Sequence, residues 1–80
     1  MAKQISPLLS LQPAEKGKLV SFSGKRKVRN ILSQYGIFEG DVMEVLRTAP
    51  FDGPVMLRIN NREIAISKEL AAFLQVETSH

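Results

Sequence analysis

The chain has 80 residues, a formal net charge of +3 at pH 7, one histidine and no cysteine. A chain of this length makes one domain, residues 1–80, with a small core and little room for a deep substrate cleft. The lack of cysteine excludes disulfides, thiolate metal sites and cysteine nucleophiles. No stretch has the uninterrupted apolar character of a signal peptide or a membrane span, so we expect a cytoplasmic protein.

The N-terminal part of the chain predicts one strand. We expect residues 1–7 to form a partly ordered segment. Turn-forming residues at 13–17 then lead into a strand at residues 18–22.

A short amphipathic helix is predicted for residues 25–35. Its apolar residues recur at i, i+3, i+4 and i+7, which places them on one face toward a core: Val28, Ile31, Leu32 and Tyr35. Gly36 follows where helices often end in a left-handed residue. Beyond it, Ile37 and Phe38 can fold back over the helix end, and Gly40-Asp41 predicts a tight turn.

The rest of the chain reads as short strands joined by turns. Strands are expected at residues 42–47, 55–59 and 63–66, joined by a loop rich in proline and glycine and by Asn60-Asn61, which tolerates positive φ. Ser67 is a suitable cap for one helical turn at 68–71. A last strand is expected around 74–76, with residues 78–80 as a frayed tail.

These elements predict a mainly β protein with about five short strands. Closure into a small barrel would remove the exposed strand edges, so we expect a closed or nearly closed barrel with a helix between its first two strands. The predicted core is apolar and drawn from the helix and the strands: Val28, Ile31, Leu32, Val45, Leu57, Ile59, Ile64, Ile66 and Val76.

The order of these signals resembles the ferrous iron transport protein A (FeoA) family. Each matching segment is short, but together they cover nearly the whole chain: residues 8–11 with 15–20, Leu32-x-x-Tyr35-Gly36-Ile37-x-x-Gly40, Pro50-x-x-Gly53-Pro54-Val55, and residues 64–66 with Ala71, Leu74 and Val76. Ala14 stands where the family commonly has glycine, and Ser67 stands where it often has a basic residue.

The resemblance implies an SH3-like barrel that serves ferrous iron uptake without being an enzyme. It implies as partner the cytosolic part of the transporter FeoB, including its G-protein domain, near the inner membrane surface. Two alternatives remain open: the accessory barrel of a metal-dependent transcriptional regulator, and a free-standing nucleic-acid-binding barrel. An imperfectly protected strand edge is compatible with self-association.

The residues themselves offer no catalytic, cofactor or metal site. The one histidine, His80, is terminal, and no carboxylate pair or phosphate-binding glycine loop is present. An iron site would need Glu39, Asp41 and His80 to converge, for which no motif gives a reason.

The clearest charge feature is the cluster Lys25, Arg26, Lys27 and Arg29 at the predicted start of the helix. Such runs commonly form a solvated face. An acidic protein partner or the anionic inner leaflet is the functional alternative, whereas nucleic acid is not expected because the net charge is modest and aromatic residues are few.

Two aromatic loop residues are candidate partner contacts. Phe38 is expected to pack against the helix end, and Phe51 is expected to be exposed at a hairpin tip. Gly36, Gly40, Gly53 and Pro54 are expected to serve the backbone, as Tyr35 serves the helix-to-strand motif. The resulting hypothesis is docking on FeoB through the basic cluster and the Phe51 hairpin.

Overall fold

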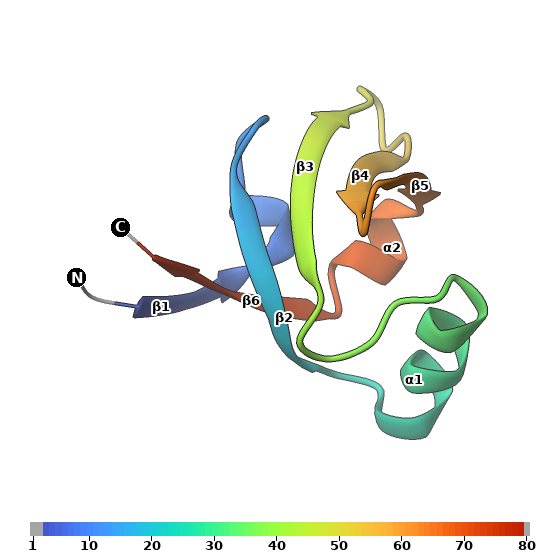
Figure 1. Ribbon diagram of the computed structural model, residues 1–80. Helices are drawn as coiled ribbons and strands as arrows, with labels where there is room; N and C mark the ends of the chain where they lie inside the picture. Colours follow the sequence, from blue (N-terminus) through green and yellow to red (C-terminus); the bar gives the residue numbers. More distant parts are fainter. Residues whose placement is uncertain (1–2, 80) are drawn as a thin grey trace.

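The computed structural model describes residues 3–79 as one bent antiparallel sheet with two helices packed beside it (Figure 1). Its elements follow in chain order: β1 (Lys3–Pro7), a 3-10 turn (Leu8–Ser10), β2 (Lys16–Phe22), α1 (Lys25–Gln34), β3 (Val42–Thr48), β4 (Val55–Ile59), β5 (Arg62–Ile66), α2 (Lys68–Ala71) and β6 (Leu74–Ser79). The mainly β, SH3-like architecture expected from the sequence is confirmed.

The sheet has six strands in the order β1-β6-β2-β3-β4-β5, so one more strand forms than the sequence predicted. Where the sequence predicted a partly ordered segment, residues 3–7 form β1, which pairs with β6 from Lys3↔Ser79 to Pro7↔Gln75. Thr78 therefore belongs to a strand and not to a frayed tail, and its hydroxyl donates to the Gln4 carbonyl at 3.4 Å. Residues 1, 2 and 80 lie outside the described residues.

The sheet curls strongly but does not close through hydrogen bonds. Register shifts interrupt the pairing of β2 with β6 between Leu19 and Ser21, and that of β3 with β4 between Val45 and Arg47. Such bulges increase twist and bend a sheet around its core. Among residues 3–79, β1 and β5 are the two outer strands and do not pair with each other, so the barrel stays open at this seam.

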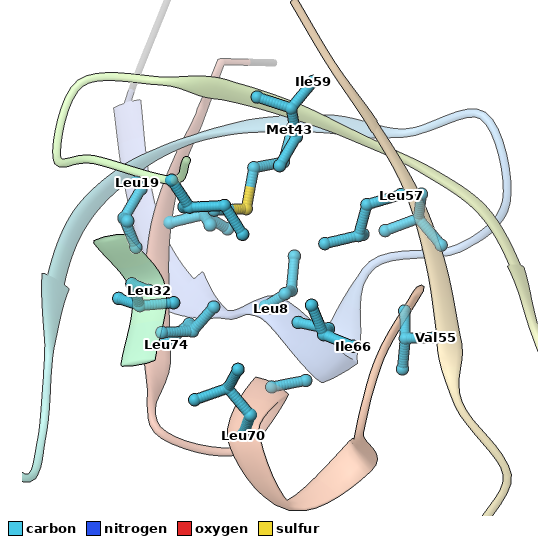
Figure 2. Close-up of a cluster of buried hydrophobic side chains, with 14 of the residues drawn as sticks. Leu8, Leu19, Leu32, Met43, Val55, Leu57, Ile59, Ile66, Leu70 and Leu74 are labelled. Atoms are coloured by element: carbon cyan, nitrogen blue, oxygen red, sulfur yellow. The ribbon is translucent and has the colours of Figure 1, made fainter. Parts of the chain in front are cut away.

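The core fills the inside of the curled sheet with aliphatic side chains from every layer (Figure 2). The 3-10 turn contributes Leu8, α1 contributes Leu32 and α2 contributes Leu70, and the strands supply most of the rest. Each fully buried side chain of this size stabilises the fold by about 1.5–3 kcal/mol. The predicted core is confirmed except that Ile31 and Ile64 are partly buried at its margin.

Helix α1 begins and ends where the sequence predicts, within one residue. Val28 and Leu32 are buried, but Tyr35 is 40% exposed and does not face the core as its spacing suggested. Tyr35 is the C-cap of α1, and its half-exposed ring lines a surface groove between α1 and α2. Ile37 folds back into the core, whereas Phe38 is 58% exposed, contrary to the expectation that it packs.

The turns follow the local signals of the sequence. Gly36 and Gly40 adopt φ values of 75° and 97°, and Asn60 and Asn61 adopt 51° and 66°. Gly53 is needed for a different reason, since a Cβ there would lie 2.6 Å from the Ala49 Cβ. The Ser67 hydroxyl oxygen accepts a hydrogen bond from the Leu70 amide at 3.1 Å, which confirms the predicted cap of α2.

Candidate interaction surfaces

The basic helix start comprises Lys25, Arg26, Lys27 and Arg29, all of which are exposed. Three of the other cations form ion pairs at 3.5–4.0 Å: Lys3 and Lys18 pair with Glu77, and Arg58 pairs with Glu44 and Glu63. Within the described part of the chain, no carboxylate forms an ion pair with the basic helix start. Positive charge is therefore concentrated at one end of α1.

An open hollow of about 660 Å³ lies beside these cations. Its walls come from the end of β2, the first turns of α1 and the loop after α1: Ser21, Phe22, Lys25, Arg26, Arg29 and Glu39. The Arg29 guanidinium carbon lies 5.9 Å from the centroid of the Phe22 ring, within the range of a cation–π contact, which helps to fix its position. Three cations against one carboxylate give the hollow a preference for anionic groups.

The backbone at the start of α1 is unusual. Gly24, the N-cap, has φ 84°, and Lys25 has φ 50°, a left-handed conformation that costs a residue with a side chain about 1–2 kcal/mol. No side chain caps the first turn, and that turn contains no acidic residue. Free N–H groups and cations thus occupy the positive end of the helix together, where an anion would be stabilising.

The hairpin between β3 and β4 presents an exposed aromatic residue. Phe51 is 99% exposed at its tip, as expected, with φ 57°, and Asp52 follows with φ 62°. The loop is closed by hydrogen bonds from the Ala49 amide to the Pro54 carbonyl at 3.0 Å and from the Gly53 amide to the Pro50 carbonyl at 3.2 Å. Phe51 is therefore held outward by an ordered turn.

The structure does not bring the basic helix start and the Phe51 hairpin together. The loop after α1 enters β3 at one end and the hairpin leaves it at the other, and the seven residues of β3 span about 23 Å. Figure 1 shows α1 and the β3–β4 hairpin on opposite sides of α2. Phe38, by contrast, is on the same loop as Glu39, which lines the hollow.

A third feature, which the sequence analysis missed, is a groove of about 300 Å³ between α1 and α2. Half-exposed rings form part of its wall: Tyr35 is 40% exposed and Phe73 is 41% exposed. Val28, Ile31 and Leu70 lie among its other lining residues, and Lys27 and Glu69 supply its charges. Its two walls are about 40 residues apart in the sequence, so no local pattern could have predicted it.

Across residues 3–79 there is no group of three or more His, Cys, Asp or Glu side chains arranged to hold a metal ion. In the same part of the chain, no helix has the length and apolar character needed to cross a bilayer.

The fold and these surfaces define a small SH3-like barrel with exposed interaction surfaces. Residues 6–78 match the FeoA domain, and the chain belongs to this family of non-catalytic accessory domains associated with ferrous iron transport. No match was found among curated proteins.

Solved structures of FeoA proteins have the same fold as this chain. The crystal structure of an iron uptake regulatory protein (FeoA) is similar over 95% of this chain and 100% of its own, with 29% identity and a TM-score of 0.85. A FeoA-like protein from Clostridium acetobutylicum is similar over 100% of this chain and 94% of its own, with 26% identity and a TM-score of 0.82. A manganese-dependent transcriptional repressor shares the fold over 99% of this chain and 44% of its own, with 15% identity and a TM-score of 0.85.

Proposed function

We propose that this chain is a non-enzymatic cytoplasmic protein that docks on the cytosolic part of the FeoB transporter and modulates ferrous iron uptake. Family membership supports the association with iron transport. The name of the similar iron uptake regulatory protein supports a modulating role. The basic helix start supports docking, because it is a surface whose charges find no carboxylate partner within residues 3–79.

The physical argument for docking rests on this unsatisfied charge. Cations near a helix N-terminus cost a few tenths of a kcal/mol each when exposed, so the free protein carries an electrostatic cost at this place. An acidic surface that meets Arg26 and Arg29 would offset the repulsion and speed encounter by long-range attraction. Phe38 is exposed next to Glu39, which lines the hollow, and is proposed as an additional apolar contact.

Modulation requires more than docking. A bound protein shifts a transporter between two states only by as much as its affinity for them differs. Because FeoB contains a G-protein domain, its nucleotide state is the natural variable to test. We propose that the accessory protein binds one nucleotide state more tightly than the other.

The first test is a calorimetric titration of this protein into the purified cytosolic region of its FeoB, with GDP and with a non-hydrolysable GTP analogue, at physiological salt. Different affinities in the two states would support modulation. Equal affinities would contradict modulation and leave a scaffold. Absence of binding to both, and to full-length FeoB in lipid nanodiscs, would overturn the docking proposal.

Two double variants locate the surface. Arg26→Gln/Arg29→Gln and the control Lys16→Gln/Lys68→Gln lower the net charge equally, but the control residues lie outside the basic hollow. We expect the first pair to weaken binding about tenfold or more and the control less than about threefold, since close charge pairs matter more than total charge. Equal losses would contradict the assignment of the surface.

A second candidate function is that of an accessory barrel in a metal-dependent transcriptional regulator. It is favoured by the shared fold of manganese-dependent repressors, although that likeness shows the fold alone and this chain spans 44% of the repressor. Such a regulator would need a DNA-binding helix-turn-helix from another polypeptide, so gel shifts of this chain test instead the free-standing nucleic-acid-binding barrel. Its binding to DNA would fall steeply from low to moderate salt, because phosphate contacts weaken with salt.

A further inference from the structure

The fully exposed ring of Phe51 is a feature that docking through the basic helix start does not use. It is 99% exposed, and the ordered hairpin holds it there at φ 57°. A large aromatic side chain presented on a rigid turn loses little conformational freedom on binding, which makes it an effective anchor. The hairpin therefore has the properties of a knob that enters a pocket of a partner.

The groove between α1 and α2 has the properties of such a pocket. Its volume is about 300 Å³, whereas an apolar cavity of about 150 Å³ is enough to hold benzene. The half-exposed rings of Tyr35 and Phe73 line it, and both would lose contact with water around an inserted phenyl ring. Phe51 of the same chain does not occupy this groove, because its own side chain is almost entirely in water.

One charge on each surface forms a complementary pair, although the groove also holds a carboxylate. Asp52 follows Phe51 directly on the knob, and Lys27 lies on the α1 side of the groove without an ion pair among the described residues. Glu69 lies on the α2 side. An inserted Phe51 is thus favoured in the orientation that turns Asp52 toward Lys27 and away from Glu69.

We propose that the Phe51 hairpin of one copy inserts into the α1–α2 groove of a second copy of this chain. The contact joins two different surfaces, so it is head-to-tail and each chain offers both halves. A reciprocal pair or a closed ring can result. The hollow that Arg26 and Arg29 line shares no lining residue with the groove, although Lys27 of the basic helix start belongs to the groove.

The test measures self-association of the isolated full chain by sedimentation equilibrium. Protein concentrations from about 10 µM to about 1 mM cover the dissociation constants expected of a small, weak contact. Phe51→Asn removes the knob and suits the left-handed conformation. We expect this variant to raise the dissociation constant about tenfold or more. Phe38→Asn, which removes an exposed ring outside both surfaces, is the matched control and should leave it unchanged.

Two groove variants examine the other half of the contact. Phe73→Gln replaces a half-exposed ring of the wall, and Lys27→Glu reverses an exposed charge with little risk to the fold. Both are expected to weaken self-association, and thermal melts establish that each variant is folded. Self-association that is unchanged in Phe51→Asn, or a wild-type protein that stays monomeric throughout, would overturn the proposal.

A mixture of the knob variant and a groove variant tests the head-to-tail geometry directly. Phe51→Asn retains an intact groove and Lys27→Glu retains an intact knob, so each alone is expected to self-associate more weakly than the wild type, while an equimolar mixture keeps one intact contact and forms a 1:1 complex. With 15N-labelled Phe51→Asn, shifts at Ile31, Tyr35 and Leu70 should appear on mixing. A mixture that stays monomeric would contradict the head-to-tail contact. FeoB is absent from these experiments, so they succeed or fail independently of the docking proposal.

Discussion

The two ends of α1 are built in opposite ways. At the C-terminal end, the Ile37 amide donates to the Leu32 carbonyl at 2.9 Å and the Gly36 amide donates to the Ser33 carbonyl at 3.0 Å, the pattern of a Schellman motif. The Arg62 guanidinium adds bonds to the carbonyls of Tyr35 and Gly36 at 3.4 and 3.2 Å.

The N-terminal end has no comparable support. Gly24 provides no capping side chain, Lys25 is held in a left-handed conformation, and the cations face the positive end of the helix. The C-terminal end is built for stability, whereas the strain and the unpaired cations at the N-terminal end are what the docking proposal rests on.

The largest expected effect on stability is at the C-terminal end of α1. Gly36→Ala should lower the free energy of unfolding by about 2 kcal/mol, because φ is 75° and the new Cβ would lie 2.8 Å from the Arg62 Nη2 atom. Urea unfolding measures the loss. The same substitution in an Arg62→Gln background should lower the free energy of unfolding by less, because the guanidinium that the new Cβ approaches is no longer present. Equal costs in the two backgrounds would show that Arg62 does not contribute.

Arg62→Gln alone is expected to lower the free energy of unfolding by about 1 kcal/mol, the next largest loss, since it removes charged hydrogen bonds to two helix-end carbonyls. Arg47→Gln is the control, because Arg47 is an exposed arginine on β3 with no ion pair among those found in residues 3–79. Urea midpoints that fall equally in the two variants would mean that the link from β5 to α1 is not stabilising.

Local chemistry explains what the sequence could predict. The end of α1 at Gly36, the Asn60-Asn61 turn and the Ser67 cap all depend on neighbouring residues, so each was recognisable. Strand β1 was not, because it pairs with residues at the other end of the chain and presents mostly exposed side chains.

The candidate surfaces divide in the same way. The basic cluster and the exposure of Phe51 could be predicted from adjacent residues. The cation–π contact of Arg29 with Phe22 and the groove between α1 and α2 could not, since both arise from packing between separate elements. The sequence predicts that Phe38 packs against the helix end, because the next apolar residues often cover such an end, but only Ile37 does so.

At the N-terminal end of α1, a substitution that relieves backbone strain should stabilise the protein. Lys25→Asn is expected to raise the free energy of unfolding by about 0.5–1 kcal/mol, because asparagine tolerates the left-handed conformation better and one repelled cation is removed. Lys27→Asn makes the same chemical change within the helix, where asparagine is a poorer helix former, and should be neutral or destabilising. A gain that is equal in both variants would assign the effect to charge and not to the backbone.

The smallest expected effect connects stability with binding. Arg26→Glu places an acidic residue in the first turn of α1 and should stabilise the fold by about 0.5 kcal/mol at low salt, a gain that shrinks toward about 1 M salt. Gln34→Glu adds negative charge at the other end of the same helix and should destabilise it slightly. Calorimetry with FeoB should show weaker binding for Arg26→Glu and unchanged binding for Gln34→Glu. A stabilised Arg26→Glu variant with unchanged affinity for FeoB would contradict this link between stability and binding. The unpaired charge of the helix start would then have no part in docking.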